Sequence, residues 1–504
     1  MTRTAPAHID AATFRDLGHR LVDQVAGLLE SLPSRPVTRD ESPTSVREAL
    51  DLDGRLPQTG LDPALLLEQT APLLFDHSLF NAHPRFFGYI TSSPAPIGIL
   101  GELLAAALNP NVGAWRLSPA ATEIEAQTVR WIAELIGFPI ASGGLLVSGG
   151  NMANIVCLMA ARMAKADWDI RTDGVAGSSA RRLRVYASSE AHTWIQKGAD
   201  MAGLGTASIR WIATDARLRM DVAALRRQIE ADRAAGDIPC LVAGTAGSVS
   251  TGAIDPLREI SALCREHQVW FHVDGAYGGF AAALPDAPED LRALGVADSV
   301  AVDPHKWLYA PLEAGCALVR DAAALRAAFA YHPPYYHFDE HATNYLDYGP
   351  QNSRGFRALK VWLAMKHIGA DGYRQMIGDD IRLSRLMADT VRSHPELALE
   401  TQDLSITTFR YVPPDLRSQI GDAETERHLD VLNRTLLDRL QRGGEVFLSN
   451  AVINERYLLR ACIVNFHTDR QDVEATAGIV ARIGRGIDAE LRGTSNHSRT
   501  QAVT

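Results

Sequence analysis

Short apolar runs alternate with amphipathic stretches over residues 143–320, and this alternation constrains the fold more than any other feature of the chain. The clearest apolar runs are Leu183–Ala187, Cys240–Ala243, Val269–Val273, Ser299–Val302 and Cys316–Val319. Stretches with helical spacing cover residues 221–232, 256–267 and 322–329. Strands that take turns with helices predict an α/β domain whose mostly parallel sheet has helices on both faces. Because ligands bind such sheets beyond the carboxyl ends of the strands, functional residues are expected there.

A chain of 504 residues suits a large domain joined to a smaller one. Residues 1–90 have the pattern of helices with breaks, and residues 91–380 that of the large domain. Residues 381–490 indicate a smaller α+β domain, with strands expected at Ser405–Tyr411, Glu445–Ser449 and Tyr457–Ile463. The tail, residues 491–504, is rich in Ser, Thr and Asn and is expected to be disordered.

Composition argues against several classes of protein. The net charge of −10 is spread over both signs without a basic stripe, so nucleic acid is not expected as a partner. No apolar leader opens the chain and no uncharged apolar run reaches the length of a membrane span, so no membrane association is expected. Five scattered cysteines without a Cys-x-x-Cys pair favour a reducing, cytoplasmic setting and no metal site.

The strongest chemical signal is Asp303-Pro304-His305-Lys306-Trp307, which follows the predicted strand Ser299–Val302. A lysine amine that attacks an aldehyde must lose its proton. Partial burial and a neighbouring cation both favour the neutral amine. A surface lysine after a strand is the alternative interpretation, and it is weakened by the residues that accompany Lys306.

Asp274 ends the apolar run Val269–Val273 and is followed by Gly275, Ala276, Tyr277 and two more glycines. A carboxylate beside a pyridine nitrogen keeps that nitrogen protonated, which makes the ring an electron sink. The small residues leave room for a flat ring. A role as the cap of the next turn would also suit Asp274, but it leaves the spacing between Asp274 and Lys306 unexplained.

Three more segments follow predicted strands and precede helices. Gly149, Gly150 and Asn151 open a helix, and their backbone N–H groups suit a phosphate. His192, in Ser188-Ser-Glu-Ala-His192, could stack on a ring at the same sheet edge. Thr245 ends the next strand and is a further candidate for contact with the ring.

Together these segments resemble the pyridoxal-5′-phosphate (PLP)-dependent group II amino acid decarboxylases, the family of the aromatic-L-amino-acid decarboxylases. The resemblance spans residues 75–470. It includes His83-Pro84-Arg-Phe86-Phe87, Ser118-Pro119-Ala-Ala-Thr-Glu123 and Phe356-Arg357-Ala-Leu-Lys360-Val-Trp362. The resemblance implies the aspartate-aminotransferase-type fold (fold type I). It also implies a homodimer in which the N-terminal helices pack on the partner and each site borrows residues from both chains.

Residue roles follow from the matching motifs. Lys306 is expected to hold PLP as a Schiff base and Asp274 to partner the pyridine nitrogen, with His192 stacked on the ring. Gly149, Gly150 and Asn151 are expected to bind the phosphate. The remaining cofactor contacts implied by the resemblance are Thr245, Ala276, Asp303 and His305.

In this family a mobile loop after the lysine strand carries a tyrosine that protonates the substrate carbon once carbon dioxide has left. The corresponding stretch is Tyr331-His-Pro-Pro-Tyr335-Tyr336-His337, where Tyr335 takes the position and Tyr336 is the fallback. Relatives with phenylalanine there tend to be oxygen-consuming aldehyde synthases. A tyrosine together with His192 therefore favours simple decarboxylation, although tyrosines that merely pack the loop are the alternative.

The expected substrate is a neutral aromatic L-amino acid: tyrosine, phenylalanine, tryptophan or dihydroxyphenylalanine. Tyr89, Ile90, Thr91 and Trp115 are expected to form its pocket, which Gly113 is expected to widen where the family often has a bulky residue. An aliphatic or diamino acid, oxidative conversion to an aldehyde, and an inactive relative that serves as a binding protein are the alternatives. Arg460 could reach the site or form an ion pair between domains. Departures from the family pattern at Gly275, in the phosphate loop and over residues 349–355 leave the substrate open.

Overall fold

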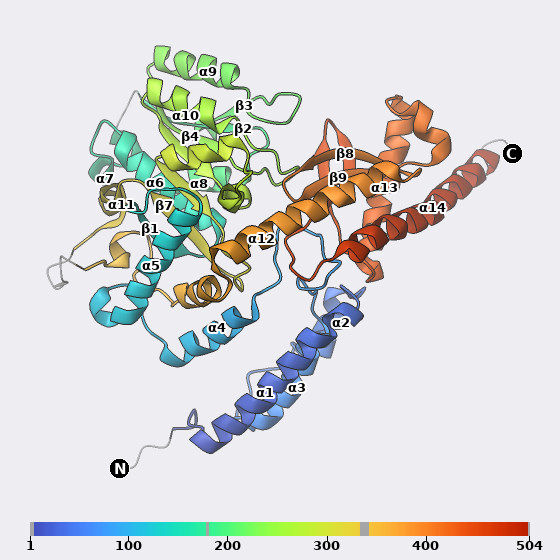
Figure 1. Ribbon diagram of the computed structural model, residues 1–504, viewed down its shortest axis with the longest axis horizontal. Helices are drawn as coiled ribbons and strands as arrows, with labels where there is room; N and C mark the ends of the chain where they lie inside the picture. Colours follow the sequence, from blue (N-terminus) through green and yellow to red (C-terminus); the bar gives the residue numbers. More distant parts are fainter. Residues whose placement is uncertain (1–4, 178–180, 333–341, 502–504) are drawn as a thin grey trace.

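The computed structural model describes residues 5–177, 181–332 and 342–501. Two sheets form the body of the protein, and the long helix α12 (Ala358–Ser393) runs between them. Figure 1 shows the larger sheet near the start of α12 and the smaller sheet along its far half, with the N-terminal helices projecting from the body. Within the described residues, no helix is both long enough and apolar enough to cross a membrane.

The larger sheet has seven strands in the order β1-β7-β6-β5-β4-β2-β3. Its strands are β1 (Gly143–Val147), β2 (Leu183–Ser188), β3 (Ile209–Ile212), β4 (Ile238–Thr245), β5 (Trp270–Asp274), β6 (Ser299–Val302) and β7 (Gly315–Val319). Strand β7 runs antiparallel to both of its neighbours, whereas β3, β2, β4, β5 and β6 run parallel. The predicted α/β fold with a mostly parallel sheet is confirmed.

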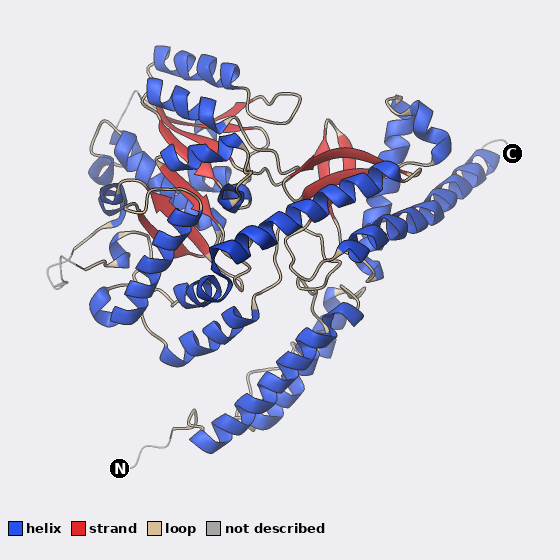
Figure 2. Ribbon diagram, in the orientation of Figure 1, coloured by secondary structure: helices blue, strands red, loops and turns tan. Residues whose placement is uncertain are grey.

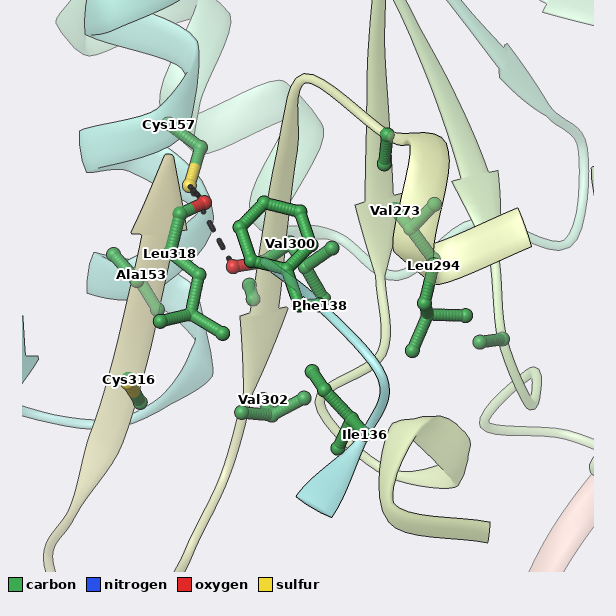
Figure 3. Close-up of a cluster of buried hydrophobic side chains, with 14 of the residues drawn as sticks. Ile136, Phe138, Ala153, Cys157, Val273, Leu294, Val300, Val302, Cys316 and Leu318 are labelled. Atoms are coloured by element: carbon green, nitrogen blue, oxygen red, sulfur yellow. Dashed lines mark hydrogen bonds between the residues drawn. The ribbon is translucent and has the colours of Figure 1, made fainter. Parts of the chain in front are cut away.

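Helices lie around this sheet (Figure 2). They are α5 (Pro119–Leu135), α6 (Gly150–Lys165), α7 (Ile170–Asp173), α8 (Trp194–Met201), α9 (Val222–Ala234), α10 (Leu257–Glu266) and α11 (Ala322–Phe329). Strands β1, β5, β6 and β7 are buried at every position, as expected for a sheet covered on both faces. Figure 3 shows part of this core, where Cys157 of α6 lies over Val300 and Leu318 of the sheet.

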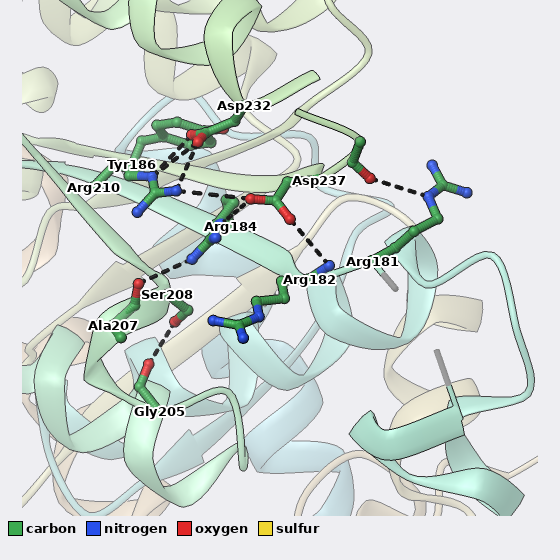
Figure 4. A network of polar contacts seen from close by, with 11 residues as sticks. Arg181, Arg182, Arg184, Tyr186, Gly205, Ala207, Ser208, Arg210, Asp232 and Asp237 are labelled. Carbon is green, nitrogen blue, oxygen red and sulfur yellow. Dashed lines mark hydrogen bonds and ion pairs between the residues drawn. The ribbon is translucent and has the colours of Figure 1, made fainter. Parts of the chain in front are cut away.

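The β3 edge of the sheet is held by charged and polar side chains (Figure 4). Asp232 of α9 accepts from the Tyr186 hydroxyl at 2.9 Å and pairs with Arg210 at 2.7 Å. Asp237 pairs with Arg184 at 2.6 Å. Strand β3 was not predicted from the sequence. Its two central residues, Arg210 and Trp211, are partly exposed, so it lacks the continuous apolar run that marks the central strands.

The smaller domain has an antiparallel sheet in the order β10-β11-β9-β8 and the helices α13 (Ala423–Gly443) and α14 (Arg470–Gln501). Its strands are β8 (Leu397–Asp403), β9 (Ile406–Tyr411), β10 (Ser449–Ile453) and β11 (Arg456–Cys462). The strand predicted at Glu445–Ser449 is wrong, because β10 begins where that prediction ended. The apolar run Val446–Leu448 is buried for another reason: Phe447 bridges to Phe86 and stacks on its ring at 5.3 Å.

Helix α12 joins the two domains rather than marking a boundary between them. It packs against α4 and α5 at its start and against β8, β9 and α14 further on. Its axis breaks at Gly369, whose φ of 71° lies in the region that favours glycine. The boundary expected between residues 380 and 381 falls inside this helix.

The N-terminal region consists of α1 (Ala11–Ser31), α2 (Pro43–Ala49), α3 (Pro63–Asp76) and α4 (Pro96–Leu108). Helices α1 and α3 pack side by side and extend away from the body (Figure 1). At the other end, α14 continues to Gln501, so the tail expected to be disordered from residue 491 extends a helix instead. No proline interrupts it, and adding residues to a formed helix is easier than starting one.

Candidate active site

A cavity of about 360 Å³ opens at the carboxyl ends of the central strands. It is lined by every described residue of the predicted site: Lys306, Asp274, His192, Gly149, Gly150, Asn151, Thr245, Ala276, Asp303 and His305. These residues come from β1, β2, β4, β5 and β6 or from the turns that follow those strands. The topology thus brings together segments that are far apart in the sequence, at the edge where parallel strands end.

Lys306 projects from the turn after β6. Its Nζ lies 2.9 Å from Asp303 Oδ2, and its backbone N–H donates to the Asp303 carbonyl. Trp307, the next residue, is fully buried and stacks on Tyr277 with ring centroids 4.7 Å apart. Contacts of Asp303 and Trp307, which stand on either side of Lys306 in the sequence, therefore hold this turn in place.

Asp380 of α12 also holds this turn, through two hydrogen bonds. Its Oδ2 accepts from Trp307 Nε1 at 2.9 Å and from the Tyr309 hydroxyl at 2.6 Å. Burial raises the pKa of Asp380 to about 7, although these two hydrogen bonds oppose the shift. The helix that joins the domains thus also holds the residues beside Lys306.

Asp274 is the last residue of β5 and its side chain is almost fully buried. Oδ1 accepts from the Ala276 backbone N–H at 3.1 Å. Thr245 lies directly across from Asp274 on β4, and Ala301 lies across from it on β6. The carboxylate therefore stands at the centre of the sheet edge, facing the cavity.

The turn from β1 into α6 has the features of an anion site. Gly149 has a φ of 84°, and no side chain caps the first N–H groups of α6. A Cβ on Gly150 would lie 2.7 Å from Asp303 Oδ2 and 3.1 Å from the Ala276 methyl. His305 borders the turn, with Nδ1 2.6 Å from the Ala314 carbonyl oxygen. Exposed backbone donors at the start of a long helix suit a phosphate.

His192 forms another wall of the cavity. Its Nδ1 accepts from the Trp194 backbone N–H at 3.2 Å, which fixes the plane of the ring. The surrounding protein lowers the pKa of His192, because removal from water disfavours the imidazolium and Lys306 adds to this, while Asp274 opposes it. A neutral ring can pack flat against an aromatic cofactor.

The cavity matches the functional groups of PLP one by one. The cofactor carries a phosphate, a basic ring nitrogen and an aldehyde, and the cavity presents helix N–H groups, the Asp274 carboxylate and the Lys306 amine. Oδ1 of Asp303 is buried there without a hydrogen-bond partner. This is expected where a bound group supplies the partner. Among the described residues, no cluster of three or more His, Cys, Asp or Glu side chains is arranged to hold a metal ion.

Several lining residues were not predicted. Asn154, Tyr277, Val249, Leu312 and Glu313 all reach the cavity. Asn154 had a signal in the sequence, because it stands one helical turn after Asn151 and therefore shares its face of α6. The other four come from loops whose path the strand pattern does not fix.

The expected aromatic pocket is assembled only in part. Of its four residues Ile90 lines the cavity, whereas the Trp115 indole N–H donates to Glu123 at 2.9 Å and Tyr89 is largely exposed. Gly113 packs against the Asn352 carbonyl, which leaves no room for a Cβ, so its lack of a side chain serves packing. The expectation that it widens the pocket is not supported by this contact.

Arg460 is buried, and Nη1 donates to the Tyr89 carbonyl at 2.9 Å and to Ser449 Oγ at 3.0 Å. Nε and Nη2 have no partner, and no carboxylate of the described residues pairs with this side chain. The ion pair between domains that the sequence left open is therefore not present in the described part of the chain. Tyr335 and Tyr336 lie outside the described residues.

Comparison with known proteins agrees with this geometry. The family model for the pyridoxal-dependent decarboxylase conserved domain matches residues 43–412. An aromatic-L-amino-acid decarboxylase of Bacillus atrophaeus is 32% identical over 470 residues, which cover 92% of this chain and 94% of that protein. A phenylacetaldehyde synthase of Petunia hybrida is 28% identical over 94% of each chain.

Solved structures give the same result. The crystal structure of Oryza sativa TDC with PLP and tryptamine superposes with a TM-score of 0.88 at 27% identity, covering 96% of this chain and 100% of that one. Mouse CSAD superposes with a TM-score of 0.86 at 27% identity, over 93% of this chain and 98% of that one.

Proposed function

Because the chain belongs to the pyridoxal-dependent decarboxylase family and is a PLP-dependent amino acid decarboxylase, we propose that it converts a neutral aromatic L-amino acid to the corresponding amine and carbon dioxide. Tyrosine, phenylalanine, tryptophan and dihydroxyphenylalanine are the candidate substrates. One observation carries the proposal: Lys306, Asp274, His192 and the uncapped start of α6 line a single cavity. The names of the relatives support the aromatic class, since they include aromatic-L-amino-acid, tryptophan and tyrosine decarboxylases.

When bound, PLP supplies a protonated pyridine that accepts the electron pair released as a bond to the substrate α-carbon breaks. The chain's own residues hold that chemistry in place. Asp274 would offer a buried carboxylate to the ring nitrogen and so favour its protonated form. The first N–H groups of α6, at Gly150 and Asn151, hold the phosphate.

Lys306 is proposed to attach the cofactor and to exchange it with the substrate amine. Asp303 Oδ2, 2.9 Å from Nζ, can take the proton that the amine must lose. His192 would lie against the ring and help to set how the bonds of the substrate are oriented. That orientation decides that the carboxylate leaves rather than the α-hydrogen.

Arg460 is proposed to help orient the substrate carboxylate. Two of its nitrogens lack partners although the side chain is buried, and buried charges are normally paired. It lies close enough to Tyr277, which lines the cavity, to influence the tyrosine electrostatically. A substrate carboxylate would be a partner of suitable charge for these nitrogens.

The rest of the cavity supports a neutral aromatic side chain. Ile90, Val249 and Leu312 supply apolar surface, and among the described residues that line the cavity Lys306 is the one lysine or arginine. Glu313 and Asp303 would repel a second carboxylate on the substrate. An aromatic ring is therefore a better fit than a dicarboxylic amino acid.

Tyr335 is proposed to protonate the substrate carbon, with Tyr336 as the fallback. The second candidate function is oxidative conversion to an aromatic aldehyde, because aldehyde synthases occur among the relatives in both sequence and structure. A tyrosine at this position favours the amine as product.

The working unit is proposed to be a homodimer in the cytoplasm. Helix α4 exposes Leu100, Leu103, Leu104 and Leu108, each at least half accessible in the single chain. An apolar face of this kind is normally covered by another surface. All five cysteines are unpaired, which supports a reducing compartment.

The test is a product assay on purified enzyme loaded with PLP. Each aromatic amino acid is supplied in turn, and amine with carbon dioxide is measured against aldehyde with ammonia and hydrogen peroxide. Amine as the main product from at least one aromatic substrate is expected. Aldehyde as the main product would contradict the proposal, and protein that takes up no PLP would indicate an inactive relative.

A further inference from the structure

Beneath Asp274, one face of the sheet carries a chain of buried polar side chains. Trp270, His272 and Asp274 alternate along β5 and therefore share a face, and Ser299 lies beside His272 on β6. Asn154 of α6 covers this face and reaches the cavity. His272 and Ser299 are fully buried, so every donor among them needs an acceptor inside the protein.

The direction of these hydrogen bonds follows from the donors available. The Trp270 indole N–H can only donate, and it does so to Ser299 Oγ at 2.8 Å. Because Ser299 Oγ already accepts from Trp270, we assign its own proton to His272 Nδ1, 2.9 Å away. The Cys157 sulfur also lies near this hydroxyl, but it is a weaker acceptor than a ring nitrogen.

The tautomer of His272 sets the direction of its hydrogen bond with Asn154. Burial lowers the pKa of His272 to about 4, so the ring is neutral and carries one proton. With Nδ1 assigned as the acceptor, the ring proton belongs on Nε2, which lies 2.7 Å from Asn154 Oδ1 and donates to it. Rotating the Asn154 amide by half a turn would place its N–H₂ against the Nε2–H of His272, so that two donors would face each other. Its Nδ2 is left for the cavity.

We propose that Asn154 is a further cofactor-binding residue, whose side-chain N–H₂ is held by this relay and donates on the Asp274 side of the bound cofactor. The inference rests on the proposed cofactor role of Asp274. It also gives two buried residues a definite role, because His272 positions Asn154 and Ser299 fixes the tautomer of His272.

The direct test is the dissociation constant of PLP, measured by titrating apoprotein and following absorbance or tryptophan fluorescence. Asn154→Asp keeps an oxygen for His272 Nε2 but puts an acceptor where the donor stood. PLP should bind about tenfold more weakly, or worse, as expected for the loss of a hydrogen bond to a polar or charged partner. An unchanged dissociation constant would overturn the proposal.

Two further variants separate this role from folding. Asn433→Ala removes a fully buried asparagine of the smaller domain, which bonds to the Tyr411 backbone, and should lower the melting temperature without changing PLP affinity. Ser299→Ala removes the donor to His272 Nδ1 and should weaken PLP binding in the same direction as Asn154→Asp. Tight PLP binding by Ser299→Ala would contradict the relay. Because the readout is binding, these results stand apart from the identity of the substrate, whereas a wild-type protein that binds no PLP would refute the proposed function itself.

Discussion

Helix α6 has sixteen residues and buries eight of them against the sheet, whereas α1 has twenty-one residues and, in the part of the chain that the structure describes, buries Leu17 alone. Helix α6 starts at the cavity and packs against other elements of the same chain. Helix α1 lies against α3 and leaves Phe14 and Val22 exposed. The cavity thus has much of its wall from a well-packed part of this chain, while the N-terminal region presents apolar surface that this chain does not cover.

This difference shows which effects should follow from changes in each region. Substitutions around the cavity should alter chemistry or the stability of the single chain. Substitutions on the N-terminal helices and α4 should alter assembly. Four changes test this division.

Lys306→Ala should cause the largest loss. Removing the amine abolishes cofactor attachment and a proton-transfer group, so amine formation should fall on the order of 10³-fold. Turnover of the PLP-supplemented variant measures this, and Lys366→Ala, which removes a lysine from the surface of α12, is the matched control. Turnover within tenfold of wild type would show that Lys306 is not the attachment residue.

Glu125→Ala should cost the most stability. Glu125 of α5 is fully buried and pairs with Arg354, which also donates to the Leu146 carbonyl at 2.7 Å. Breaking a buried pair leaves an unpaired buried charge and costs roughly 3–5 kcal/mol of unfolding free energy. Urea denaturation measures the loss. Glu134→Ala, on the exposed side of the same helix, should cost far less, and equal losses for both variants would contradict this account.

Leu103→Asp combined with Leu104→Asp should act on assembly instead. Both side chains are at least half exposed on α4, and charges there would be buried without partners in the proposed dimer. The dimer should dissociate at least about thirtyfold more readily, as sedimentation velocity over a concentration series would show. Leu56→Asp, in an exposed loop, is the control. An unaltered dimer would place the interface elsewhere.

Asp380→Asn should change the stability of the single chain in a way that depends on pH. The pKa of Asp380 is raised from 3.8 to about 7, so the stability that this group contributes is fully present below pH 3.8 and is lost as the pH rises through 7. Asparagine does not titrate. Relative to wild type, the variant should therefore gain stability between pH 5 and pH 8, measured by urea denaturation. The same difference at both pH values would rule this out.

The described residues that the sequence singled out for the site line one cavity, and the sequence could point to them because they stand next to strong local signals. Lys306 and Asp274 each follow a short apolar run, and Gly149 and Gly150 separate a strand from a helix. Strand β3 and β10 were missed or misplaced because an edge strand is partly polar and a buried apolar run need not pair in a sheet. Val446–Leu448 is such a run: Phe447 is buried against Phe86 of the N-terminal region, far away in the sequence.

By itself, the sequence predicted the α/β fold and the residues at the strand ends from local patterns of apolar and small residues, and its resemblance to the PLP-dependent decarboxylases implied the cofactor. The tertiary structure decided what surrounds them: Asp380 behind Trp307, the unpaired nitrogens of Arg460, and the relay from Trp270 to Asn154. These contacts join residues far apart in the chain, and the direction of a buried hydrogen bond depends on which partner folding brings within reach.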